Sequence, residues 1–276
     1  MQIERLVFSL IITVLLGSGG CATLPEKYRS LDSGKELRLE EVLPLVGEGK
    51  VIFVGEGHDS VEDHLVQYEV IKYLHDTGKK VAVALEMFEA ERQPLLDRWS
   101  DGALSEDEFE RTYSASWEVP YGNYGAIFEY TRREGLPLFG INGDPQSIGA
   151  VAKRGLASLP EGYRKKIGAM SCDDLPEYKK MMEPFKPRTT HVRDFLFFCD
   201  AQLLRDTVMA YNIAGILARD DYTVVAMVGS VHAMKWAVPA MLSRYTKGEI
   251  KVLVSKAFTD LLFRKPSLQI ADYVWY

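Results

Sequence analysis

Short apolar runs recur along the chain and predict the strands of a parallel sheet. They are rich in β-branched residues and continuous rather than alternating, which is typical of strands buried on both faces. They span residues 51–54, 81–85, 136–141, 223–228 and 251–254. Between them lie segments with apolar residues three or four positions apart, clearest from Val61 to Asp76, which predict helices. The alternation predicts an α/β fold, a parallel β-sheet flanked by helices.

One long segment breaks this alternation. Between Asp144 and Asp221 the sequence contains no strand pattern, and helices are expected at residues 147–159, 175–182 and 191–219. We therefore expect a smaller, all-helical subdomain, inserted into the α/β domain at about residues 144–221. Its last helix would return the chain to the sheet.

The first residues indicate export. Leu6–Leu16 is apolar except for two hydroxyl residues, too short to span a bilayer, which takes roughly 20 apolar residues, but suited to a signal peptide. The small residues 17–20 precede Cys21 and resemble the lipidation motif of bacterial lipoproteins. We expect a signal peptide at residues 1–20, a lipid anchor on Cys21, a tether over 21–40 and the folded domain over 41–276.

The expected location follows from the same segment. Ala22, the residue after Cys21, favours the outer over the inner membrane of a Gram-negative host, so we expect a membrane-anchored lipoprotein facing the periplasm. In that oxidising compartment Cys172 and Cys199 can form a disulfide, and two buried free thiols are the alternative. The net charge of -6 and the scattered basic residues argue against a nucleic-acid-binding protein.

Polar side chains gather where the predicted strands end. Glu56 and His58 follow the first strand, Glu86 the second, and His232 the fourth. Carboxyl ends of parallel strands share one edge of a sheet, so these side chains should lie close together. They could hold a divalent metal, with a carboxylate as general base, or perform acid–base chemistry without metal. The alternative is a buried polar network that only ties loops together.

The last helix of the insert carries a stripe of residues at three- and four-residue steps. The stripe is formed by His191, Phe195, Phe198, Gln202, Asp206 and Met209. Because its first half is apolar, it should face the core. Gln202 and Asp206 would then be buried polar groups that need partners, which the strand-end cluster could supply.

Five motifs, taken together, resemble the ChaN-type haem-binding lipoproteins. They are Gly55-Glu56-x-His58 with His64-x-x-Gln67, Leu85-Glu86-Met87, Ala201-Gln202-x-x-Arg205-Asp206-x-x-Met209-Ala210, Gly229-x-x-His232, and Trp117 with Tyr124. Each is weak alone, but their order and spacing agree with the family over nearly the whole mature chain. The resemblance implies a role in haem and iron uptake, with an outer-membrane haem receptor as a partner.

The resemblance also implies how haem would be held. In the family, two haems lie face to face between the subunits of a homodimer. A tyrosine of one subunit ligates each iron, which suits ferric haem, and a histidine and a lysine of the other contact the propionates. In this chain the candidates are Tyr178, Lys179 and His191 in the insert, with Tyr124 as a second choice for the iron ligand.

The wider superfamily leaves other functions open. Tiki-type metalloproteases and erythromycin esterases resemble this chain in the Gly-Glu-x-His and Gly-x-x-His elements. This resemblance implies, as an alternative, a metal-dependent hydrolase of a peptide or ester, with Glu56, His58, Glu86 and His232 as catalytic and metal-binding residues. A structural lipoprotein that holds partners together is a third interpretation.

Overall fold

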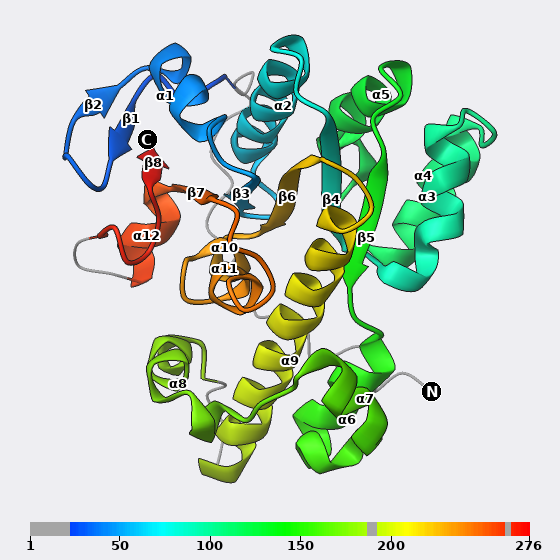
Figure 1. The fold of residues 1–276 in the computed structure, drawn as a ribbon, viewed down its shortest axis with the longest axis vertical. Coiled ribbons are helices and arrows are strands. Elements are labelled where there is room, and N and C mark those ends of the chain that lie inside the picture. Colours follow the sequence, from blue (N-terminus) through cyan, green and yellow to red (C-terminus); the bar gives the residue numbers. More distant parts are fainter. Residues whose placement is uncertain (1–22, 187–191, 263–265) are drawn as a thin grey trace.

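The computed structural model describes residues 23–186, 192–262 and 266–276. An eight-stranded sheet, in the order β2-β1-β8-β7-β3-β6-β4-β5, lies between layers of helices (Figure 1). The strands are β1 (Tyr28–Ser30), β2 (Glu36–Leu37), β3 (Val51–Glu56), β4 (Val81–Glu89), β5 (Leu138–Asn142), β6 (Thr223–Gly229), β7 (Ile250–Ser255) and β8 (Tyr273–Trp275). The five predicted strands are confirmed as β3 to β7.

The central strands are parallel and buried on both faces. β3 pairs in parallel with β6 and β7, and β4 with β6 and β5. Along β3, Ile52 and Val54 face one apolar cluster, whereas Val51 and Phe53 face the other. This double burial explains why the sequence of these strands is continuously apolar.

The edge of the sheet departs from the expected all-parallel arrangement. β1 runs antiparallel to β2 and β8, with Tyr28 opposite Trp275. The prediction of a tether over residues 21–40 is therefore wrong for residues 28–37. Strands of two and three residues carry too little pattern to be recognised, yet Tyr28 is fully buried. Cys21 and the predicted signal peptide at residues 1–20 lie outside the described residues.

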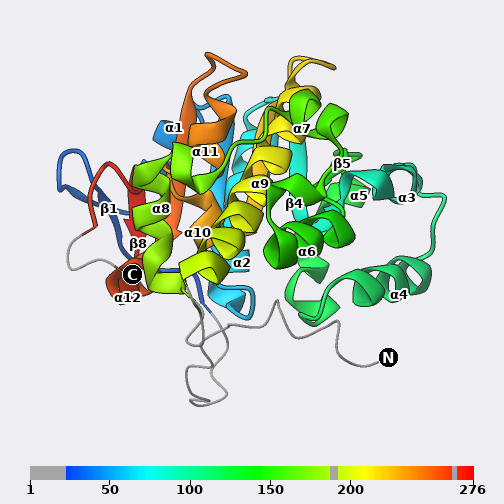
Figure 2. The same ribbon diagram turned by 90° about the horizontal axis from the view of Figure 1, so that it is seen from below.

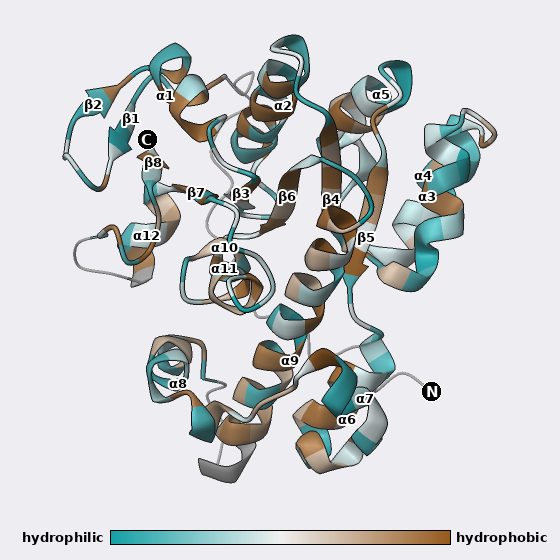
Figure 3. Cartoon of the chain, viewed as in Figure 1, coloured by the Kyte–Doolittle hydropathy of each residue, from teal (hydrophilic) through white to brown (hydrophobic). Residues whose placement is uncertain are grey.

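Helices cover both faces of the sheet. They are α1 (Leu39–Val46), α2 (Val61–Asp76), α3 (Gln93–Ser100), α4 (Glu106–Ser116), α5 (Gly125–Arg133), α6 (Pro145–Arg154), α7 (Glu161–Ile167), α8 (Pro176–Met182), α9 (Val192–Leu217), α10 (Ser230–Ala233), α11 (Val238–Leu242) and α12 (Lys256–Leu262). Helices α1 to α5 share one apolar cluster with the sheet, and α9 and α11 share the other. Apolar strands occupy the centre, and many helices turn polar faces outward (Figure 3).

The predicted helical insert is confirmed as α6 to α9. Ile148, Val151, Leu204 and Val208 belong to a small apolar cluster of its own. Cys172 and Cys199 form a disulfide that joins the segment before α8 to α9. The second half of α9 packs on the sheet, so this helix carries residues from the insert to the strand ends. Within the described residues, no helix is long and apolar enough to cross a membrane.

Candidate functional site

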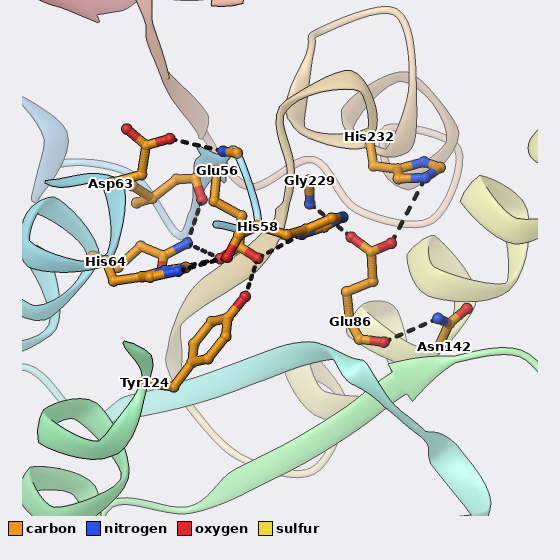
Figure 4. Close-up of polar contacts among 12 residues, drawn as sticks. Glu56, His58, Asp63, His64, Glu86, Tyr124, Asn142, Gly229 and His232 are labelled. Atoms are coloured by element: carbon orange, nitrogen blue, oxygen red, sulfur yellow. Dashed lines mark hydrogen bonds and ion pairs between the residues drawn. The ribbon is translucent and has the colours of Figure 1, made fainter. Parts of the chain in front are cut away.

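The residues expected at the strand ends lie together at one edge of the sheet (Figure 4). Glu56 ends β3, Glu86 lies in β4, and His232 is in α10, directly after β6. These three strands are neighbours in the order β3-β6-β4. All three side chains are buried, so their charges interact through protein rather than water.

Glu56 is the centre of the first half of the site. Its Oε1 accepts a hydrogen bond of 2.5 Å from the Tyr124 hydroxyl and lies 2.8 Å from His58 Nδ1. Its Oε2 accepts from Gln67 Nε2 at 2.7 Å and lies 3.4 Å from His64 Nδ1. The helix spacing of His64 and Gln67 places both beside this carboxylate, as their i, i+3 relation requires.

These contacts decide the charges of the first half. Burial alone would raise the pKa of Glu56, but the His58 and His64 imidazoles bonded to it outweigh burial and hold the pKa far below its usual range. Burial would lower the pKa of both histidines, but the Glu56 carboxylate raises both above their ordinary value. Contact between the groups therefore favours an ionised Glu56 carboxylate and protonated imidazoles beside it.

Glu86 is the centre of the second half. Its Oε2 accepts the Gly229 backbone N–H at 2.7 Å. Its Oε1 lies 3.6 Å from Arg205 Nη1 and 3.7 Å from His232 Nε2, and has no hydrogen-bond donor among the described residues. Burial opposes ionisation of Glu86, but the charges of His232, Arg205 and His58 outweigh it and lower the pKa.

The insert completes this second half. Asp206 Oδ1, on α9, lies 2.5 Å from His232 Nδ1, and Asp206 Oδ2 accepts a 2.6 Å hydrogen bond from the Tyr178 hydroxyl on α8. The prediction that a buried Asp206 finds its partner in the strand-end cluster is confirmed. Gln202, one turn earlier on α9, is by contrast only half-buried.

The two halves repeat one chemical arrangement. In each, a tyrosine hydroxyl donates to a carboxylate that also holds Nδ1 of a histidine: Tyr124–Glu56–His58 and Tyr178–Asp206–His232. A carboxylate on Nδ1 fixes the tautomer and leaves Nε2 available for proton transfer. The His58 side chain is 23% exposed and that of His232 10% exposed, so solvent reaches both imidazoles.

Gly229 allows these halves to approach each other. A Cβ at this position would lie 3.0 Å from His58 Cε1 and 3.2 Å from Nε2. Only glycine lets the His58 ring lie over the end of β6 while the Gly229 N–H reaches Glu86. The edge of the His58 ring also meets Trp117, with ring centroids 5.0 Å apart.

The prediction of a divalent metal is not supported. No group of three His, Cys, Asp or Glu residues is placed to hold one ion in the described parts of the chain. Tyrosine hydroxyls, an amide and the imidazoles already occupy the oxygens of Glu56 and Asp206. Glu56, His58, Glu86 and His232 are thus brought together as a buried polar cluster, in which His58 bonds to Glu56 and His232 lies 3.7 Å from Glu86.

The two tyrosines predicted as iron ligands are not presented to solvent. Tyr124 is fully buried and Tyr178 is 4% exposed, and burial together with the neighbouring carboxylate raises the pKa of each phenol. Lys179 pairs with Asp173, Nζ to Oδ1, at 2.5 Å, and His191 lies outside the described residues. The tyrosine–carboxylate contacts join residues 68 and 28 positions apart. No local sequence motif therefore indicates them.

Comparison with known proteins identifies the family. A family model described as haem-binding uptake, Tiki superfamily, ChaN, matches residues 44–242, more than half of the chain. The chain belongs to this ChaN family. No curated protein was found to match it.

Solved structures show how far the ChaN fold extends. ChaN of Campylobacter jejuni, whose structure shows cofacial haem binding, is 16% identical with a TM-score of 0.66, over 90% of this chain and 95% of that one. A mutant erythromycin esterase in an open conformation is 15% identical with a TM-score of 0.51, over 83% and 76%. A succinoglycan biosynthesis protein is 12% identical with a TM-score of 0.50, over 79% and 68%. At these identities the likeness concerns the fold.

Proposed function

We propose that this protein binds haem and takes part in haem and iron uptake. The observation that carries the proposal is the match of the ChaN haem-binding family model over residues 44–242. The cofacial haem of the Campylobacter jejuni relative supports a homodimer that forms around two haems. The predicted signal peptide and the lipidation motif at Cys21 support a lipoprotein of the outer membrane that faces the periplasm and works with a haem receptor.

The surface of α8 and the start of α9 has the chemistry that a porphyrin requires. Met181, Phe185 and Phe198 are half-buried there, and the two phenylalanines pack against the apolar cluster that α9 shares with the sheet. Lys180 is exposed on the same short helix, and Lys186 lies over the Phe195 ring. Apolar side chains can contact the flat face of a porphyrin, and nearby lysines can pair with its two carboxylates.

The iron ligand is a separate question. Tyr124 and Tyr178 would each have to leave a carboxylate and a buried position to reach iron. The structure therefore favours another ligand over these two. His191 stays a candidate from the sequence alone, as does Lys179 for a propionate once it separates from Asp173.

Haemin absorbance tests the proposed surface. We expect a saturable Soret band, weakened at least tenfold in apparent affinity by Met181→Asp, because a charge would face the porphyrin. Leu95→Asp, on α3 far from this surface, is the matched control and should bind as the unchanged chain does. Equal affinity of both variants would show that haem binds elsewhere.

A second candidate function, a metal-independent hydrolase, follows from Glu86. Its Oε1 is buried without a hydrogen-bond donor while Arg205 and His232 Nε2 face it, a place suited to a substrate hydroxyl or a water molecule. A panel of ester and peptide substrates tests this function. Turnover that Glu86→Gln and His232→Ala abolish would establish it, and no turnover in the unchanged chain would exclude those substrates.

A further inference from the structure

The chain enters the fold at the edge of the sheet that carries the polar network. β1 is antiparallel to β8, and Tyr28, its first residue, lies opposite Trp275, the last residue of β8. β8 is parallel to β7, and Trp275 lies opposite Ser255, the last residue of β7. The Tyr276 N–H also donates to the Lys27 carbonyl. The N-terminal segment therefore leaves the body from the carboxyl edge of the parallel strands.

The distance from this edge to Cys21 is short. The described chain begins at Thr23, and Leu24 already packs against the apolar cluster of α1 and α2. Cys21 lies seven positions before Tyr28, and seven residues of fully extended chain span at most about 25 Å. A lipid on Cys21 would therefore keep this edge near the bilayer.

Exposed apolar side chains lie on the same edge. Val61, at the start of α2, is 42% exposed, Leu261, near the end of α12, is 61% exposed, and Tyr276 is 37% exposed. They follow β3, β7 and β8, which are neighbours in the sheet. Trp275 Nε1 donates to Asp63 Oδ1 at 3.2 Å, which ties the start of α2 to the end of β8. Figure 2 shows α12 and the C-terminus at the bottom, with α1 and α11, which precede strands, at the top.

We infer that the carboxyl edge of the sheet, with Val61, Leu261 and Tyr276, rests on the lipid surface of the membrane. The inference depends on the lipid anchor of the proposed function and adds an orientation to it. The free energy of a lipid-anchored protein falls when apolar side chains at its edge enter the headgroup region of the bilayer. Glu56, Glu86 and His232 then lie on the side of the body that faces the bilayer. Their ligand would be one that reaches them from the lipid surface.

Energy transfer to lipid measures this orientation. The acylated full chain, in phosphatidylcholine vesicles with acceptor dye on the headgroups, would carry a donor on Glu62→Cys or on Glu48→Cys. Both positions are exposed; Glu62 lies on the carboxyl edge and Glu48 before β3, on the opposite one. The disulfide keeps Cys172 and Cys199 unlabelled. We expect several-fold greater transfer from position 62, whereas equal or reversed transfer overturns the inference.

Matched variants test the apolar contacts. Leu261→Asp combined with Val61→Asp should reduce the contrast between positions 62 and 48, and Leu45→Asp should not, since Leu45 is 38% exposed on α1. If the double variant shows the same difference in transfer between positions 62 and 48, Val61 and Leu261 do not contact the lipid. If donors at position 62 transfer energy to each other and not to lipid, the edge contacts a second copy of the chain instead of the membrane. A chain that is not acylated overturns the anchor as well, and haem binding does not enter the measurement.

Discussion

At the level of single residues, the buried carboxylates Glu56, Glu86 and Asp206 organise the site. Each contacts imidazole, guanidinium, amide or hydroxyl partners at short range. The sequence predicted that Glu56, Glu86 and His232 meet, because strand ends share an edge. It did not predict the carboxylate partners of Tyr124 and Tyr178, because a tyrosine that bonds to a carboxylate and one that ligates iron look alike in a sequence.

Replacement of the two tyrosines separates these roles. Tyr124→Phe and Tyr178→Phe should each lower the free energy of unfolding by about 1–3 kcal/mol, since a buried carboxylate oxygen loses its donor. Both should retain haem binding, because the hydroxyls face carboxylates. Urea unfolding and haemin absorbance measure the two effects, with Tyr73→Phe on α2 as control. Loss of the Soret band in either variant would identify that tyrosine as the iron ligand.

Asp63 should make a pH-dependent contribution to stability. Burial raises its pKa to about 6, against the hydrogen bonds from Gly57 and Ser60. The folded state then holds a proton more tightly than the unfolded chain. The resulting stabilisation is full below pH about 4 and is lost as the pH rises through about 6.

Asp63→Asn removes this titration. Relative to the unchanged chain, its free energy of unfolding should rise by on the order of 2–3 kcal/mol between pH 4 and pH 7. Comparison of the two proteins at each pH cancels the titration of Glu56 and the histidines. A difference that stays constant with pH would show that Asp63 titrates normally.

At the level of elements, the sequence predicted β3 to β7 because burial on both faces makes those strands continuously apolar. It missed β1, β2 and β8, whose two or three residues show no period. Helices α2 and α9 were predicted within two residues of their bounds, since long amphipathic stretches carry the strongest signal. Short helices such as α10 and α11 follow strands so closely that only tertiary contacts define them.

The packing of α10 on β3 depends on Gly55. A Cβ there would lie 2.8 Å from Ala233 Cβ and 2.9 Å from Ser230 Cα, too close without movement of α10. Gly55→Ala should therefore cost about 1–3 kcal/mol. Gly57→Ala is the control, because its Cβ would meet Asp63 at 3.6 Å, an ordinary contact. Thermal or urea unfolding compares the two, and equal stability would contradict the packing.

Within the insert, the disulfide fastens the segment before α8 to α9. Cys172 and Cys199 are 27 positions apart, and closing a loop of this length stabilises the folded state by about 3–4 kcal/mol in the chain-entropy model. The Cys172→Ser, Cys199→Ser double variant should lose about that much. Reduction of the unchanged chain should lower its stability similarly but leave the double variant unaffected. A stable reduced protein would show that packing alone holds the insert.

At the level of the whole molecule, the insert and the sheet build the site jointly. Tyr178 and Asp206 come from the insert, whereas Glu56, Glu86 and His232 follow the strands of the sheet. The fold class and the family were readable from the order of the motifs. The charge network was not, because contacts between distant segments arise only when the chain is folded. The edge that carries this network is also the edge from which the N-terminal segment departs.

One titration decides whether this protein binds haem. Haemin would be added to the chain that starts after Cys21, while absorbance and size-exclusion chromatography follow it. We expect saturation near one haem per chain, with a shift from monomer to dimer as the two porphyrins meet. If the folded chain with its disulfide intact shows no saturable binding, the proposed haem-binding function is wrong.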